Sequence, residues 1–487
     1  MQANQVLVGD CLTRMAEIPA GWAHCVVTSP PYFALRSYLP KDHPDKAKEI
    51  GSEPTPDAFI ATMLEVFRGV RRVLRDDGQL WLNLGDSYEA GTSKQRRPRG
   101  PIEHGYWANG EISQRVSVGM TPGCQLLMPH RVALALVADG WCLRSTVIWQ
   151  KLSPMPESVS GWRWRRCRIK IKPQVKGKQG GATHMGRSRD MSNGQYLGSA
   201  EYIPCPGCKK CIPNGGYVLR RGKWRPTNAF EYLFQFSKGK DYFGDGDAVA
   251  EPSVSDQPSG NGFKRPHRES YDGRGQDERW NAATRNPRNV WTFPNEPFKG
   301  KHFATFPSSL PKRCIEASTS AKGCCPDCGA CYAPIVESVR KPTRPGLNTK
   351  IRSDGYEHRP DIDPDTNWQN STLHYGKSVT DRVHHDSDVC GNRDPERHVT
   401  ANVVTGYRPT CLCLSLAIAG PVPCRVFDPF LGSGQTARAA HWLGRDWLGC
   451  ELNPTYADLV PGRIAKRPKW ATASDTMSDR PLLRGAG

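Results

Sequence analysis

Two kinds of hydrophobic pattern alternate through residues 5–150, and this alternation restricts the fold more than any other feature of the chain. Short β-rich runs such as QVLVGD and AHCVVTSPPY are separated by amphipathic stretches, of which PDAFIATMLEVFRGVRRVLRDDG (56–78) is the longest. Strand, helix and strand in succession are typical of an α/β fold, because neighbouring parallel strands need a crossover connection. The sequence therefore predicts an α/β domain built on a parallel sheet.

A strand–turn–helix–strand pattern recurs near the other end of the chain, in VFDPFLGSGQTARAAHWLGRDWLGCEL (426–452). After Asp428, Gly432 and Gly434 let backbone amides approach a ligand at the start of a helix. Glu451 ends the next strand, where a carboxylate can accept hydrogen bonds from the two hydroxyls of a ribose. The pattern departs from G-x-G-x-x-G, so it favours an adenosine cofactor without pyrophosphate. A purely structural turn is the alternative.

The segment TSPPY (28–32) follows a β-rich run and combines rigidity with an aromatic ring. Pro30 and Pro31 fix φ twice, remove two backbone donors and force Ser29 out of helical geometry. Ser29 to Tyr32 should therefore form a rigid, extended exit from a strand. Such an exit is either part of a functional site or a turn that merely ends the strand.

These motifs together resemble a known family. VFDPFLGSGQT followed by GCELNPTYADL resembles the S-adenosylmethionine loop of DNA amino-methyltransferases, and TSPPY resembles their catalytic motif. The catalytic motif comes first and the cofactor loop last, as in the circularly permuted β group of these enzymes. The resemblance is to methyltransferases of restriction-modification systems or of phages. The resemblance covers roughly residues 5–150, 225–318 and 424–466. It implies a Rossmann-like methyltransferase fold, circularly permuted, with S-adenosylmethionine as cofactor.

The family's chemistry assigns a role to each residue of TSPPY. An exocyclic base amine is a poor nucleophile because its lone pair is delocalised into the ring. The Ser29 hydroxyl and the Pro30 carbonyl could accept hydrogen bonds from that amine, and the rigidity of Pro30 and Pro31 would place these acceptors in advance. Tyr32 would offer a stacking face to a base rotated out of the duplex. Methyl transfer would be direct, without a covalent enzyme intermediate.

The same resemblance places further residues around the cofactor. Asp10 would lie near the adenine, Asp428 near the methionine amino group and Phe430 beside the loop, together with Gly432, Gly434 and Glu451. The segment KHFATFP (301–307) would pack against the cofactor from the far side. Asp10 as a turn residue and Phe430 as core packing are the alternatives.

The chain contains eighteen cysteines. Because its N-terminal segment is polar and does not resemble a secretion signal, we expect these thiols to be reduced and some of them to bind metal. CPGCKKC presents Cys205, Cys208 and Cys211 at metal-ligand spacing, and Cys167 in the basic stretch RWRRCRIK is the candidate fourth ligand. A tetrahedral zinc ion would give shape to a segment that cannot build its own core.

A second set of cysteines resembles a split zinc ribbon. CCPDCGACY supplies Cys325 and Cys328, and CLC supplies Cys411 and Cys413. A metal bound to all four would join the two ends of the polar segment between these pairs. The neighbouring thiols of Cys324 and Cys331 leave this ligand set ambiguous. For both sets the alternative is that the thiols are simply buried.

The charge of the chain points to a polyanionic partner. Lys and Arg number 67 against 48 acidic residues, a net charge of +19, and residues 161–190 carry ten Lys or Arg against one acidic residue. Basic residues interleaved with Trp162 and Trp164 indicate contacts to DNA phosphates and bases. The longest apolar run is too short to cross a bilayer, so we expect a cytoplasmic protein that binds double-stranded DNA. A cognate restriction endonuclease is a further candidate partner.

These patterns divide the chain into six segments. They are the catalytic half of the methyltransferase domain (1–150), a basic Cys-containing insertion for target recognition (151–224), a return to the methyltransferase domain (225–318), a zinc-ribbon-like insertion with a flexible middle (319–423), the S-adenosylmethionine-binding half (424–467) and a disordered tail (468–487).

The sequence thus predicts a site-specific DNA methyltransferase that acts on the N4 amine of cytosine. Within the resembled family, Ser before Pro-Pro-Tyr is more usual in cytosine-N4 enzymes and Asp in adenine-N6 enzymes, so adenine N6 is the runner-up. A DNA-binding protein without catalysis and a protein glutamine methyltransferase are the rivals from other classes.

Overall fold

The computed structural model describes residues 1–35, 37–40, 42–89, 120–154, 160–171, 189–190, 195–196, 201–252, 284–294, 296, 306–342, 398–413 and 420–471. The chain divides into two compact units. The first comprises Met1–Asp245, Arg288–Ala333 and Pro409–Gly487, and the second comprises Gly246–Pro287 and Pro334–Arg408.

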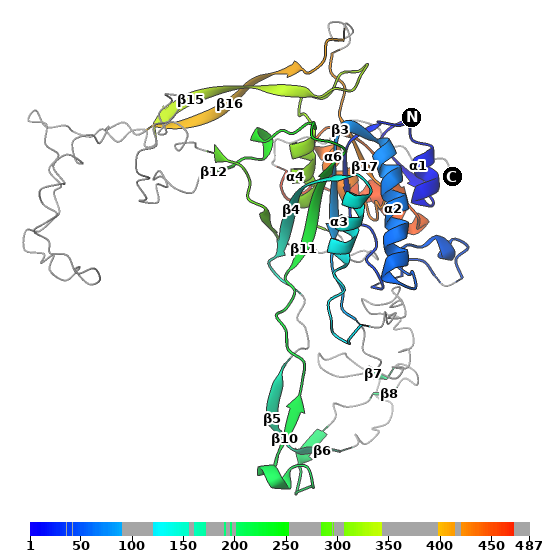
Figure 1. Ribbon diagram of the computed structural model, residues 1–487, viewed down its shortest axis with the longest axis vertical. Coiled ribbons are helices and arrows are strands. Elements are labelled where there is room, and N and C mark those ends of the chain that lie inside the picture. Colours follow the sequence, from blue (N-terminus) through cyan, green and yellow to red (C-terminus); the bar gives the residue numbers. More distant parts are fainter. Residues whose placement is uncertain are drawn as a thin grey trace, which may run out of the picture. The chain divides into compact units, whose positions relative to one another are not determined.

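An eight-stranded sheet forms the centre of the first unit (Figure 1). All its strands run in one direction except β11, which is antiparallel to both of its neighbours. The predicted α/β fold with a mainly parallel sheet is thus confirmed. In spatial order the strands are β1 (Gln5–Val8), β18 (Asp446–Glu451), β17 (Arg425–Asp428), β2 (Ala23–Thr28), β3 (Leu74–Leu84), β11 (Phe230–Ser237), β4 (Cys142–Lys151) and β14 (Val290–Phe293).

Helices cover both faces of this sheet. One face packs against α1 (Cys11–Ala16), α2 (Pro56–Val73) and α3 (Met128–Ala138). The other packs against α4 (Ser309–Ser318), α6 (Gln435–Trp442) and α8 (Leu459–Ile464), with the short α7 (Pro454–Ala457) before α8.

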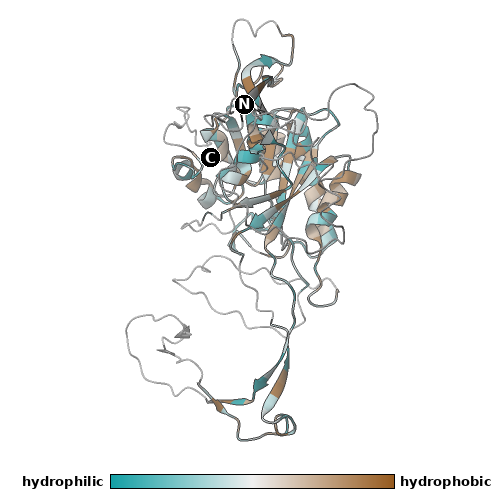
Figure 2. Ribbon diagram, turned by 90° about the vertical axis from the view of Figure 1, so that its left-hand side faces the viewer, coloured by the Kyte–Doolittle hydropathy of each residue, from teal (hydrophilic) through white to brown (hydrophobic). Residues whose placement is uncertain are grey.

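The two cores follow from the alternation of side chains along each strand. On β3, Leu80 and Leu82 join the cluster under α2, whereas Trp81 joins the cluster under α4. In Figure 2 the strands of the sheet and the helices beside them carry many apolar residues, drawn in brown.

Helix α2 shows how local sequence fixes an element and where our expectation was wrong. Thr55 caps the helix by accepting a hydrogen bond from the Ala58 amide, and Pro56 occupies the first turn, where no donor is needed. The amphipathic pattern predicts a helix to residue 78, but the helix ends at Val73. Leu74 is fully buried and pairs with Ala23 in the sheet, so strand pairing begins at once.

Several smaller elements complete the described structure. In the first unit β5 (Trp162–Arg166) pairs with β10 (Tyr217–Arg221), β6 (Arg168–Ile171) with β9 (Glu201–Pro204) and β7 (Arg189–Asp190) with β8 (Gln195–Tyr196). The second unit contains β12 (Glu251–Pro252) paired with β13 (Thr284–Arg285), and most of β15 (Tyr332–Pro342) paired with β16 (His398–Pro409). The 3-10 turns are η1 (Lys46–Lys48), η2 (Ile212–Asn214) and η3 (Asp247–Val249). None of the helices in the described ranges is long and apolar enough to span a membrane.

Candidate active site

The sheet brings the two ends of the chain together at one edge. Strand β2 leads to the TSPPY segment and β17 leads to Asp428, and the two strands are parallel neighbours in which Cys25 pairs with Val426. The carboxyl ends of parallel strands meet at the same edge, which is where α/β folds bind ligands. The hydroxyl of Thr28 donates a 2.7 Å hydrogen bond to Asp428 Oδ1, and both side chains are buried.

Asp428 is held by donors from three directions. Besides Thr28, the Thr436 hydroxyl at the start of α6 donates to Asp428 Oδ2 at 2.7 Å, and the Phe430 amide donates to Oδ1 at 3.0 Å. Burial raises the pKa of Asp428 to about 6, and these hydrogen bonds act in the opposite direction. The carboxylate therefore fixes the relative positions of β2, the loop after β17 and α6.

The Gly-rich turn between β17 and α6 depends on its two glycines. Gly432 and Gly434 have φ values of +54° and +88°, which disfavour residues with a side chain. A Cβ on Gly434 would also lie 2.9 Å from Val460 Cγ1. Between them, the buried Ser433 hydroxyl has no hydrogen-bond partner among the described residues. The turn thus combines a tightly constrained backbone with an unused buried hydroxyl.

Glu451 lies beside this turn at the end of β18. Its Oε2 accepts a hydrogen bond from the Gly432 amide and its Oε1 accepts one from the Asn453 amide, both at 2.8 Å. Burial raises the pKa of Glu451 to about 7, although both amide bonds favour the ionised form. Each carboxylate oxygen can still accept a further hydrogen bond.

Asp10 follows β1, the neighbour of β18. Its carboxylate accepts hydrogen bonds from the amide and the hydroxyl of Thr13 and so caps α1. The backbone contact from the Gly9 amide to the Glu451 carbonyl, at 2.9 Å, keeps this turn beside the end of β18. Phe430 is partly buried and packs against the core under α2.

The TSPPY segment contains a hydrogen-bonded tyrosine. The Tyr32 hydroxyl donates to Glu231 Oε2 at 2.6 Å and accepts from the Asn83 amide nitrogen at 2.9 Å. The Ser29 hydroxyl lies 3.4 Å from both the Tyr32 hydroxyl and the Asn83 nitrogen. Burial and the adjacent Glu231 carboxylate raise the pKa of Tyr32 well above its ordinary value. A Cβ on Gly85 would lie 2.6 Å from the Tyr32 ring, so Gly85 leaves room for that ring.

Sequence reasoning missed several members of this network. Glu231 on β11 also accepts hydrogen bonds from Lys151 at the end of β4 and from Asn83, the latter at 2.8 Å. Asn83 Oδ1 is buried and has no hydrogen-bond partner in the described part of the chain. A polar Asn within the apolar run LWLNL was the available signal. The other residues missed were Thr28 and Thr436, which contact Asp428.

The structure also brings together both predicted cysteine sets. The Sγ atoms of Cys167, Cys205, Cys208 and Cys211, here called the Cys167 cluster, all lie within 4.8 Å of one another, as do those of Cys325, Cys328, Cys411 and Cys413, the Cys325 cluster. In the first, separations of 3.9, 3.5 and 3.9 Å between sulfur atoms are close to the edge of a tetrahedron with zinc–sulfur bonds of about 2.3 Å. Backbone amides at Lys210 and Cys211, with the Cys211 thiol, lower the pKa of Cys208 to about 7 and favour its thiolate form.

The Cys167 cluster closes one end of a ribbon formed by β5 and β10, which we call the basic ribbon. The Cys167 amide, directly after β5, donates to the Gly216 carbonyl, directly before β10. Trp162 and Trp164 project from β5 with 67% and 53% of their surface exposed. The Arg221 guanidinium lies 4.9 Å from the centre of the Trp162 ring. Cationic and aromatic groups thus lie side by side on this exposed ribbon.

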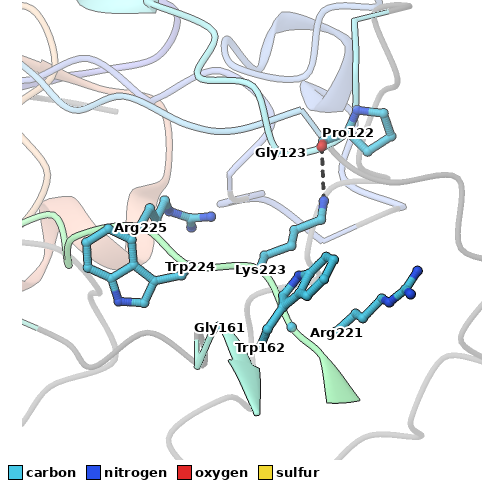
Figure 3. A pocket seen from close by; sticks show the side chains of 9 residues that line it. Pro122, Gly123, Gly161, Trp162, Arg221, Lys223, Trp224 and Arg225 are labelled. Atoms are coloured by element: carbon cyan, nitrogen blue, oxygen red, sulfur yellow. Dashed lines mark hydrogen bonds between the residues drawn. The ribbon is translucent and has the colours of Figure 1, made fainter. Parts of the chain in front are cut away.

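A recess of about 560 Å³ lies at the other end of the basic ribbon (Figure 3). Two of its lining residues are joined by a hydrogen bond of 3.0 Å, which Lys223 donates to the Pro122 carbonyl. None of its lining residues belongs to the site around Asp428. They are Pro122, Gly123, Gly161, Trp162, Arg221, Gly222, Lys223, Trp224 and Arg225.

Three expectations fall largely outside the described residues. Residues 301–305 of KHFATFP, most of the flexible middle of the segment 319–423, and the tail from residue 472 onward are not described.

Comparison with known proteins identifies the family. A family model described as DNA methylase, of the N6/N4 methyltransferase type, matches residues 23–328 and 425–461. The type II methyltransferase M.XycI of Xanthomonas campestris pv. cyanopsidis is 31% identical over 319 residues, which cover 66% of this chain and 74% of the relative. M.Cfr9I of Citrobacter freundii is 30% identical, covering 64% and 71%, and M.SmaI of Serratia marcescens is 28% identical, covering 66% and 78%. The chain therefore belongs to the DNA methylase family and is an S-adenosylmethionine-dependent DNA methyltransferase of the N6/N4 type.

Proposed function

We propose that the protein transfers a methyl group from S-adenosylmethionine to the exocyclic N4 amine of cytosine in duplex DNA. The observation that carries this proposal is the Thr28–Asp428 hydrogen bond of 2.7 Å, which sets the exit of β2 beside the Gly-rich turn after β17. An acceptor segment and a nucleoside-binding turn at one sheet edge are what direct methyl transfer requires. In this proposal the fold is circularly permuted and the six sequence segments keep their predicted boundaries.

The residues around the Gly-rich turn fit the cofactor. Glu451 has acceptor capacity left on both carboxylate oxygens for two ribose hydroxyls. Ser433 offers a buried hydroxyl that lacks a partner among the described residues, and Gly432 and Gly434 supply the positive φ values that the turn requires. Asp428 would lie near the methionine amino group, Asp10 near the adenine and Phe430 beside the loop. When bound, the cofactor supplies an electrophilic methyl group.

The TSPPY segment would bind the reacting amine. The Ser29 oxygen and the Pro30 carbonyl accept hydrogen bonds from its two N–H groups, which localises the nitrogen lone pair. As the nitrogen gains positive charge these acceptors stabilise it without reorganising, because Pro30 and Pro31 hold the backbone. The Ser29 hydroxyl hydrogen can point to the Tyr32 oxygen, 3.4 Å away, which leaves the Ser29 lone pairs available to the amine.

Tyr32 would stack on the base after it rotates out of the duplex. Its hydroxyl is fixed by Glu231 and Asn83, and its ring is accommodated by Gly85, so its plane is set before DNA binds. Asn83 is then a positioning residue for Tyr32. A preset ring face lowers the cost of capturing a flipped base.

The basic ribbon is the proposed DNA-contacting surface for target recognition. Its arginines would neutralise phosphates, and the exposed rings of Trp162 and Trp164 would stack on or insert between bases. A zinc ion in the Cys167 cluster would hold the ribbon's end, and a second in the Cys325 cluster would join the ends of the segment 319–423. Since the relatives above are named type II methyltransferases, a cognate restriction endonuclease is the proposed partner.

Transfer of a labelled methyl group tests this proposal. Long unmethylated duplex DNA is incubated with the protein and methyl-labelled S-adenosylmethionine, and label on the DNA is counted. The wild type should label DNA, whereas Ser29→Ala should lose most of the transfer rate while binding the cofactor with unchanged affinity. A Ser29→Ala rate equal to the wild type would rule out the assigned role of Ser29.

A further inference from the structure

Three cysteine thiols and one imidazole converge at a place that neither of the two clusters above includes. A ring nitrogen of His24 and the Sγ atoms of Cys324 and Cys424 lie within 4.8 Å of one another, and the Cys331 Sγ lies 3.7 Å from that of Cys424. All four side chains are at most 2% exposed. We propose that His24, Cys324, Cys331 and Cys424 form a third metal site, a structural Cys3His zinc site.

The donor set and its spacing fit zinc. Three thiolates and one imidazole are among the ligand sets that structural zinc sites use, and zinc–sulfur bonds of about 2.3 Å place tetrahedral sulfur atoms about 3.8 Å apart. The separation of 3.7 Å between Cys331 and Cys424 matches that edge. The same separation is far longer than the sulfur–sulfur bond of a disulfide, about 2.05 Å. Cys331 already lies at this spacing from Cys424, and its sulfur would move toward His24 and Cys324 to enclose an ion.

The backbone explains why adjacent cysteines serve different sites. Cys324 pairs with Cys331 and with Val422 in extended bridges, and in extended chain successive side chains point to opposite sides. Cys325 accordingly points to its own cluster, whereas Cys324 points to His24 and Cys424. The run CCPDCGAC thus contributes two ligands to each of two neighbouring sites, which resolves the ambiguity that the sequence left around Cys324 and Cys331.

His24 already has the surroundings of a metal ligand. Its Nε2 lies 2.8 Å from the Gly329 carbonyl, and its Nδ1 accepts from the Arg425 amide at 3.0 Å. A ligating histidine ordinarily keeps its second ring nitrogen on a backbone or carboxylate partner, which orients the ring. Because Nδ1 accepts from the Arg425 amide, it carries the lone pair that can bind an ion. Zinc would therefore replace that amide at Nδ1, and the bond from Nε2–H to the Gly329 carbonyl would be retained.

The location assigns the site a structural role in the methyltransferase domain. His24 is near the start of β2 and Cys424 directly precedes β17, so both lie at the opposite end of these strands from Thr28 and Asp428. An ion there would join the two strands whose far ends carry the acceptor segment and the Gly-rich turn. It would tie them to the turn at Cys324 and Cys331, and it would take no part in the reaction.

The alternative is that these are buried thiols without metal. In that state the Cys324 and Cys424 thiols would keep their weak contacts, at 3.5 and 3.8 Å, to the carbonyls of Pro423 and Ser320. Metal analysis of the purified full-length chain separates the two states. With zinc also in the Cys167 and Cys325 clusters, the wild type should hold three zinc ions per chain, Cys424→Ser two, and Cys142→Ser three, since Cys142 belongs to none of the sites.

The difference between wild type and Cys424→Ser decides the inference whatever the other two clusters bind, and it is independent of the methyl-transfer assay. An equal zinc content in the two proteins would overturn it, as would a Cys331–Cys424 disulfide found by mass mapping after alkylation under native conditions. If Cys424→Ser does not fold, Co²⁺ titration of the metal-free wild type replaces it. Thiolate-to-cobalt absorption that saturates at three equivalents supports the third site, and saturation at two rejects it.

The role of His24 has its own measurement. Because the site is buried, its ion should be the last that a chelator removes from the folded wild type. In His24→Ala the third ion should leave at least tenfold faster, while the release of the other two is unchanged. Identical release curves for the two proteins would remove His24 from the ligand set.

Discussion

The Thr28 hydroxyl donates to Asp428 Oδ1 at 2.7 Å across a sequence separation of 400 residues. Thr28 immediately precedes Ser29, and Asp428 immediately precedes the turn that carries Gly432 and Gly434. This bond therefore connects the two halves of the candidate active site directly.

Removing this donor tests that connection. Thr28→Val keeps the shape of the side chain but leaves the buried Asp428 with two donors, and we expect the free energy of unfolding to fall by about 1–3 kcal/mol. Thr436→Val is the matched control, because it removes the other hydroxyl donor of Asp428 from within α6. Chemical denaturation should show a loss for both variants, whereas the methyl-transfer rate should fall further in Thr28→Val. Equal rates in the two variants would contradict the link to Ser29.

Glu451 makes cofactor binding depend on pH. With its pKa raised to about 7 by burial, most of the free enzyme at pH 6 carries a neutral carboxyl group, which accepts hydrogen bonds poorly. As the pH rises, the Glu451 carboxyl group ionises and accepts hydrogen bonds well again. The affinity for the cofactor should therefore increase by about tenfold between pH 6 and pH 8. Calorimetric titration with S-adenosylhomocysteine measures this. Glu451→Gln should bind weakly and show no change between pH 7 and pH 8, and a flat wild-type profile would argue against this role of Glu451.

Tyr32 should affect turnover rather than cofactor affinity. Tyr32→Phe removes the hydroxyl that Glu231 and Asn83 hold, so the ring loses its fixed orientation. We expect kcat to fall by about tenfold, the equivalent of one hydrogen bond of about 1.4 kcal/mol, with the cofactor Kd unchanged. Asn83→Leu, which removes one of the two partners, should cause a smaller loss in the same direction. A raised cofactor Kd with normal kcat would mean that Tyr32 contacts the cofactor and not the base.

The basic ribbon should contribute salt-dependent DNA affinity. Arg221→Ala should weaken binding to all duplexes and reduce the slope of log K against log salt by about 1. Trp164→Ala should weaken binding without changing that slope, since a stacked ring neutralises no phosphate. Fluorescence anisotropy over a salt series measures both. An unchanged slope in Arg221→Ala would mean that this arginine contacts no phosphate.

Zinc in the Cys167 cluster should matter for DNA before it matters for the cofactor. Cys208→Ser removes one ligand at the end of the ribbon, so DNA affinity or specificity should drop while cofactor affinity stays normal. Cys142→Ser serves as the control, because Cys142 lies on β4 outside every cluster. If Cys208→Ser loses cofactor affinity before DNA affinity, the Cys167 cluster does not serve DNA recognition.

Local sequence predicted the parts of the site that depend on neighbours along the chain. The strand, the Gly-rich turn and the spacing to Glu451 are contained in one stretch, so their geometry could be predicted from that stretch alone. The Tyr32–Glu231–Asn83 network could not, because it joins the segment after β2 to two strands, β3 and the antiparallel β11. The end of α2 was mispredicted because pairing of Leu74 with β2 prevails over helix propensity. Likewise, Cys324 and Cys325 face different groups of side chains because successive residues of extended chain point to opposite sides.

The base that receives the methyl group is the most direct test of the proposed function. Duplex DNA methylated by the purified protein is digested to nucleosides and analysed by mass spectrometry, with Ser29→Ala treated identically. The proposal predicts N4-methylcytosine with the wild type and little or none with the variant. N6-methyladenine would contradict the cytosine assignment, and DNA without any methylated base would contradict the catalytic role itself.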